Sequence, residues 1–240
     1  MWNLERFGFT QMMELRAGVR ALFQDEPKTT AEAAQRLDDF LYRELVDAKG
    51  SPACALVRTF KTHDYGELPA DLRTFAKRIA PEVDAQPRTR CLVLIGTTGD
   101  LAEWRQRELS RGHRCIPLVS EKMVASAPMI ARLIQQLGIS ITDVIRPDPA
   151  LLLERTETTS NVFYVPHALG SPYIVAQKEF VERYRIQSVI GFGGMLSATD
   201  LLATILFTKV PITPDVADLF KVVGLNVRLA LMPFARKPLF

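Results

Sequence analysis

The chain has 240 residues, of which 48% are hydrophobic and 24% are charged, the composition of an ordinary globular protein with one large or two small domains. The formal net charge is only +3 and basic residues alternate with acidic ones, which argues against nucleic acid as the main partner. No apolar run approaches the roughly 20 residues of a membrane span, and the start lacks the pattern of a signal peptide, so we expect a cytoplasmic protein without membrane contact.

The first part of the chain predicts three helices and two buried strands. Apolar residues at helical spacing predict a helix from Met12 to Phe23, and Thr29 followed by Glu32 forms a possible capping box for a second helix. Short apolar runs bounded by polar loops predict the strands, and a proline at the first helical position predicts the third helix. The strands are expected at 53–60 and 90–95, and the third helix at 69–80.

The middle of the chain has weaker signals. Asp100 and Pro128 can each open a helix, and a short apolar run predicts a strand at 116–119. From Ile139 to Thr159 the signals are mixed and predict no element. Because no linker or repeat is present, we expect a single domain over the whole chain, with a long irregular insertion at 97–159.

The last third of the chain has the clearest pattern. Strands are expected at 161–165, 186–192 and 201–208, with a short helix at 176–184. Thr213 caps the final helix, Pro214 is its first residue, and one of its faces is apolar. That face contains Val216, Leu219, Phe220, Val223, Val227, Ala230 and Leu231. The stripe predicts that this helix packs against the sheet.

Residues 184–231 carry a resemblance to a known family. A strand, R-I-Q-S-V-I-G-F-G-G-M-L, enters a glycine turn, and the next strand, L-L-A-T-I-L-F-T, precedes a helix that begins P-D-V-A-D-L-F. With the helix, helix, strand order at the start, this closure resembles a GAF domain. The chain looks like the N-terminal input region of bacterial signalling proteins that carry PAS, histidine-kinase or cyclase modules.

The resemblance implies a fold and a function. The fold is α/β (α+β), a GAF-like antiparallel sheet flanked by helices, with helices on one face and a ligand pocket on the other. The function is that of a non-catalytic sensory domain, which binds a small-molecule ligand. A homodimer through the terminal helices would pass the signal to an output module such as a histidine kinase or a cyclase.

The segment 161–174, N-V-F-Y-V-P-H-A-L-G-S-P-Y-I, lies where the resemblance places the wall of this pocket. It supplies aromatic and polar side chains, and the glycines around Phe192 would let a ligand or another backbone approach closely. The predicted ligand-binding residues are Phe163, Tyr164, His167, Ser171, Tyr173, Phe192 and Met195. In the competing interpretation, Phe163 and Tyr173 are core residues, and Tyr164 and His167 belong to a solvated loop.

Two other functions compete with a ligand sensor. The turn I-G-T-T-G-D, with Gly96–Asp100, follows a predicted strand as in nucleotide-binding enzymes. It lacks a third glycine and a P-loop lysine, and the charge of Asp100 opposes a phosphate. The third hypothesis is a purely structural dimerisation module, in which side chains fill the pocket.

The sequence identifies no cofactor. Haem would need a histidine held in a pocket, and His113 and His167 are the candidates. Arg114 separates His113 from Cys115, unlike the adjacent cysteine and histidine of a bilin-carrying GAF domain. The three cysteines are spaced for neither a disulfide framework nor a zinc site, and we predict no metal site and no catalytic residue.

Overall fold

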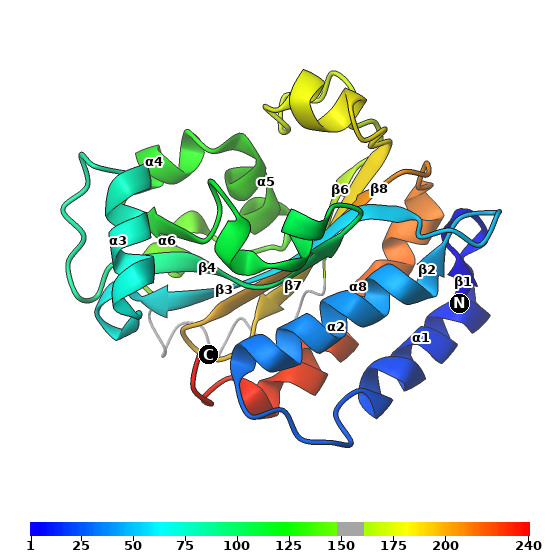
Figure 1. Ribbon diagram of the computed structural model, residues 1–240, viewed down its shortest axis with the longest axis horizontal. Helices are drawn as coiled ribbons and strands as arrows, with labels where there is room; N and C mark the ends of the chain where they lie inside the picture. Colours follow the sequence, from blue (N-terminus) through cyan, green and yellow to red (C-terminus); the bar gives the residue numbers. More distant parts are fainter. Residues whose placement is uncertain (148–160) are drawn as a thin grey trace.

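A six-stranded antiparallel sheet separates two layers of helices (Figure 1). The computed structural model describes residues 1–147 and 161–240. The strands lie in the order β5-β4-β3-β8-β7-β6, so β3 and β8 are the two central strands. Their bounds are β3 (Cys54–Asp64), β4 (Arg90–Gly99), β5 (Cys115–Leu118), β6 (Val162–Val165), β7 (Ser188–Met195) and β8 (Leu201–Thr208). A separate parallel pair joins β1 (Trp2–Asn3) to β2 (Leu45–Val46). The predicted α+β class is confirmed.

Three long helices lie on one side of the sheet, called here the first face; the second and third pack directly on the strands, and the first packs on the third (Figure 1). They are α1 (Phe9–Ala21), α2 (Thr30–Glu44) and α8 (Pro214–Leu231). The predicted caps are present, because the Thr29 hydroxyl accepts a hydrogen bond from the Glu32 amide at 3.0 Å, and the Thr213 hydroxyl accepts one from the Val216 amide at 3.4 Å. The prediction that the last helix packs on the sheet is also confirmed, since α8 lies on β7.

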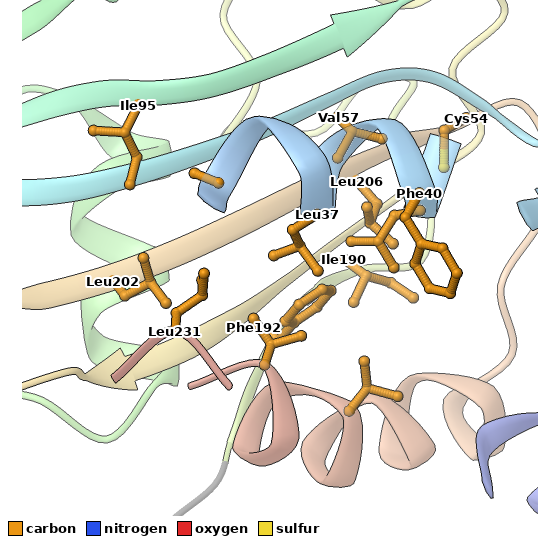
Figure 2. Packing of buried hydrophobic residues seen from close by; sticks show 14 of the residues in the cluster. Leu37, Phe40, Cys54, Val57, Ile95, Ile190, Phe192, Leu202, Leu206 and Leu231 are labelled. Atoms are coloured by element: carbon orange, nitrogen blue, oxygen red, sulfur yellow. The ribbon is translucent and has the colours of Figure 1, made fainter. Parts of the chain in front are cut away.

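The core of the first face is apolar and continuous. Figure 2 shows Leu37 of α2 among side chains of the sheet, whereas the Phe40 ring packs against Gly18 of α1 and edge-to-face on Trp2. The ring of Phe192 packs on that of Phe220, with centroids 5.6 Å apart. Burial of these side chains is the main favourable contribution to folding.

Short elements cover the opposite, second face of the sheet. They include α4 (Glu121–Ala125), α5 (Pro128–Gln136), α6 (Ile141–Ile145), the 3₁₀-helices Ala102–Arg105 and Arg107–Leu109, and the π-helix Gln177–Glu182. The implied arrangement, with helices on one face only, is therefore wrong. The second face has its own apolar residues, among them Leu56, Phe60 and Leu94, and these need cover as much as those of the first face.

The expected irregular insertion at 97–159 is more ordered than predicted in its described part. Thr97 to Gly99 continue β4, and β5 with α4, α5 and α6 follow. Helices of five residues give almost no periodic signal, which explains why α4 and α6 were not predicted. Residues 148–160 of the expected insertion lie outside the described residues.

Helix α3 (Ala70–Ile79) lies at one edge of the sheet. It is at its predicted place and packs beside β5.

The glycines of β7 lie close to the neighbouring strand. Gly193 has a φ of 151°, and an added Cβ there would be 2.1 Å from the carbonyl oxygen of Leu202. The glycines of β7 thus allow close approach of the β8 backbone. None of the helices in the described ranges is long and apolar enough to cross a membrane.

Candidate functional site

The residues predicted to bind a ligand are divided between the two faces of the sheet. Phe163 and Met195 are buried in the core of the second face, whereas Phe192 is buried in that of the first. Because side chains of a strand alternate between faces, these residues cannot line one cavity. The predicted site is therefore corrected: Phe163, Phe192 and Met195 are core residues.

The other predicted residues lie in β6 and in the loop that follows it. The Tyr164 hydroxyl donates a hydrogen bond to the carbonyl oxygen of Ile212, so Tyr164 does not belong to a solvated loop. The Ser171 hydroxyl accepts one from the Tyr173 amide at 3.3 Å, and His167 is exposed. The ring of Tyr173 lies 5.6 Å from the guanidinium carbon of Arg132 on α5.

The segment Gly96–Asp100 does not form the turn that a nucleotide would need. Gly96 to Gly99 pair with β3 as part of β4, so this segment offers no cradle of free N–H groups at a helix start. An added Cβ at Gly96 would lie 2.5 Å from a carboxylate oxygen of Asp38, which shows how closely α2 packs on the strand. Asp100 accepts hydrogen bonds from Tyr42 and Lys209.

The haem candidates do not come together either. His113 precedes β5 and His167 follows β6, and these strands form opposite edges of the sheet. Cys91 and Cys115 are buried and free, and the hydrogen bond that the Cys115 thiol makes to Cys91, together with burial, raises the pKa of Cys115. Within residues 1–147 and 161–240, no three His, Cys, Asp or Glu side chains converge in the manner of metal ligands.

A buried charged cluster lies at one end of the sheet. Lys61 Nζ is 2.9 Å from Asp200 Oδ2, and Arg90 Nη2 is 2.7 Å from Asp200 Oδ1. Arg90 Nη1 is also 2.6 Å from Asp64 Oδ1, and Arg90 Nη2 donates to the hydroxyl of Thr62 at 2.8 Å. The two cations and two carboxylates cancel, and they join β3 and β4 to the turn between β7 and β8. We call this set the charged end.

The pKa values of the charged end follow from burial and pairing. Burial alone would raise the pKa of Asp200, but Lys61 and Arg90 bring it below its ordinary value. Burial lowers the pKa of Lys61, and Asp200 opposes that shift. His63, whose Nε2 is 3.4 Å from Lys61 Nζ, has its pKa lowered to about 3 by burial and by the lysine charge, so it is neutral at pH 7.

Arg58 has a different environment at the centre of the second face. It lies on β3 opposite Thr97 of β4 and Ile205 of β8. Its Nε is buried without a hydrogen-bond partner, and within the described part of the chain no side chain pairs with its guanidinium. Burial lowers the pKa of Arg58 to about 10. An unpaired charge of this kind is costly, and such groups are concentrated at functional sites.

The carboxyl whose charge acts on Arg58 is that of Asp38, and it lies on the first face. Asp38 Oδ1 accepts a hydrogen bond from the Thr59 hydroxyl at 2.5 Å, and the same hydroxyl is 2.8 Å from that of Thr204. Burial raises the pKa of Asp38 well above its ordinary value. A carboxyl that favours its neutral form is a poor counter-ion for Arg58.

A cavity of about 280 Å³ opens at the edge of the sheet beside α3. Its lining residues are Pro69, Asp71, Leu72, Leu94, Arg107, Arg114 and Phe240. Both of its cations already have partners, because Arg114 Nη2 is 2.5 Å from Asp71 Oδ2, and Arg107 stacks on the ring of Phe240 at 3.4 Å. This cavity is therefore a weaker candidate than Arg58.

Sequence reasoning missed both Arg58 and the charged end. The available signal was the strand C-A-L-V-R-T-F-K-T-H-D, in which Arg58 and Lys61 interrupt an apolar run. No protein-family model matches the chain, and no curated protein matches its sequence at a significant level. Function is therefore inferred from the residues of the site.

Proposed function

We propose that this protein is a non-catalytic sensory domain that binds a small ligand on the second face of its sheet. The signal passes through a homodimer formed by first-face helices to an output module such as a histidine kinase or a cyclase. The difference between the two faces supports this division. Long helices cover the first face, while short elements cover the second, where Arg58 lies at the centre of the sheet.

The observation that carries the proposal is an apolar stripe on the outward side of α8. Val222, Leu229 and Met232, which follows the helix directly, are 38%, 50% and 45% exposed, and Leu225 between them is partly exposed. Their spacing of three and four residues is that of a helix seam that packs against another helix. The opposite side of α8 is already buried on the sheet.

A second copy of this chain fits the stripe best. A two-fold dimer places the same patch of each subunit against the other, so one self-complementary apolar seam is sufficient. A dimer seam on α8 also supports signalling, because the same helix contacts β7 within the sheet that carries Arg58. A displacement of the sheet therefore has a direct path to the dimer contact.

Sedimentation equilibrium of the purified chain tests the dimer. We expect wild type to be dimeric at micromolar concentration and Leu229→Glu to be monomeric, because the substitution places a charge in the seam. Leu169→Glu is the matched control, since Leu169 is 65% exposed and lies in the loop after β6. A wild-type monomer at high concentration, or a dimer that persists in Leu229→Glu, would contradict the proposal.

A further inference from the structure

We propose that Arg58 binds an oxyanion, the carboxylate or phosphate group of a small ligand, at the centre of the second face. This inference rests on the proposed function, because it names the chemical class of the ligand for the same face. The guanidinium presents a planar fork of donors that matches the two oxygens of such a group.

Arg58 and Arg90 differ in their hydrogen-bond partners. Arg90, on the neighbouring strand, contacts Asp64, Asp200, Thr62 and the carbonyl oxygen of Thr199. Arg58 has no such contact with any side chain in the described ranges. No contact within the described ranges therefore accounts for a guanidinium on this face of the sheet. A ligand that supplies the counter-charge gives this arginine a role.

The two Nη atoms of Arg58 are in contact with solvent. They have no hydrogen-bond partner in the described ranges, and only Nε of this side chain is both unpartnered and buried. The residue as a whole is partly buried. The donors of the fork are thus free to bind, while the stem is held in the sheet.

The residues around the Arg58 guanidinium limit the directions from which a ligand can approach. The Thr97 hydroxyl is engaged with the carbonyl oxygen of Trp104 at 2.8 Å. On the far side of Ile205, an added Cβ at Gly191 would lie 2.6 Å from Leu133, so α5 closes that direction. A single guanidinium matches a single anionic group, which is the ligand we expect here.

Titration with inorganic phosphate at constant ionic strength tests the proposal. We expect phosphate to raise the thermal midpoint (Tm) of wild type by about 3–6 °C at ten times its Kd. The shift is lost in Arg58→Met, which removes the charge and keeps much of the volume. Arg107→Met is the control and keeps the shift, because Arg107 lines the separate cavity at the edge of the sheet.

Nuclear magnetic resonance supplies a direct measurement. The Nε–H signal of Arg58, assigned by its absence from Arg58→Met, is expected to move and saturate with phosphate in wild type. An equal phosphate shift of Tm in Arg58→Met, or a wild type in which neither Tm nor this signal responds, would overturn the proposal.

The variants without phosphate separate a binding role from a structural one. We expect Arg58→Met to keep or raise the wild-type Tm, whereas Arg90→Met lowers it. A loss in Arg58→Met as large as that in Arg90→Met would show that Arg58 is structural. Sedimentation of wild type completes the test: a dimeric wild type that gives no phosphate response refutes only the anion, and a monomeric wild type that still binds phosphate refutes only the dimer.

Discussion

The charged end and the centre of the second face use the same side chain in opposite ways. Arg90 and Arg58 lie on neighbouring strands of one sheet; Arg90 is buried and Arg58 is partly buried. Arg90 has two carboxylates, a hydroxyl and a carbonyl oxygen as partners, whereas Arg58 has none among the described side chains. The Nε of each arginine is buried without a partner, so the two residues differ in their Nη donors, which are bonded in Arg90 and unbonded in Arg58.

The largest expected effect comes from Arg90→Met. The substitution leaves Asp64 without its cation and Asp200 with only Lys61, so we expect the free energy of unfolding to fall by about 3–5 kcal/mol. Urea unfolding at pH 7 measures it. The control is Arg88→Met, an exposed arginine two residues away, which should change stability by no more than about 0.5 kcal/mol. If the two variants were equal, the charged end would not be a structural cluster.

The next effect is the pH dependence of stability caused by His63, which lies beside Lys61 of the charged end. Unfolded His63 takes up a proton near pH 6.5, but folded His63 does so only near pH 3, so unfolding binds a proton between these values. Stability therefore falls on acidification through this window, by up to about 1.4 kcal/mol per pH unit from this group. His63→Gln should flatten the dependence, measured by urea unfolding from pH 7 to pH 4.

His167→Gln is the control for that measurement, because His167 is exposed in the loop after β6. It should keep the wild-type slope. A His63→Gln variant with the same slope as wild type would mean that the acid sensitivity of the protein arises outside the charged end.

The smallest expected effect concerns the strand edge beside Arg58. The Gln35 side chain accepts a hydrogen bond from the Thr97 amide at 3.2 Å and donates one to its carbonyl oxygen at 2.9 Å, so it pairs with β4 as a neighbouring strand would. Gln35→Ala should cost about 1–2 kcal/mol and speed amide exchange at Thr97. Exposed Gln24→Ala should do neither. Unchanged exchange at Thr97 would show that the edge is held by other contacts.

Elements with strong local signals were predictable from the sequence. The caps Thr29 and Thr213 were recognised because capping depends on residues only three positions apart. Strand β8 was predicted with its observed bounds, 201–208, because its apolar run is continuous. Strand β4 was predicted too short, because its last residues are extended only through pairing with β3, which local sequence does not encode.

The site could not be predicted in the same way. Whether Phe163 and Phe192 meet depends on which face of the sheet each strand presents, and that is decided by tertiary packing. The partners of Arg90 are equally distant in sequence, since Asp200 lies 110 residues away. For Arg58 the informative property is the absence of partners among the described residues, which requires all of its neighbours to be known.

The end of the chain is attached to the beginning of α2. The amides of Thr30 and Ala31 donate to the carbonyl oxygens of Pro238 and Leu239 at 2.9 and 3.0 Å, and the Thr30 hydroxyl donates to that of Phe234 at 2.8 Å. In mechanical terms, these bonds act as a clamp that lets tension on the segment after α8 load α2 before it reaches the sheet. A torque applied beyond α8 would therefore act on both α8 and α2, and both helices contact the sheet that carries Arg58.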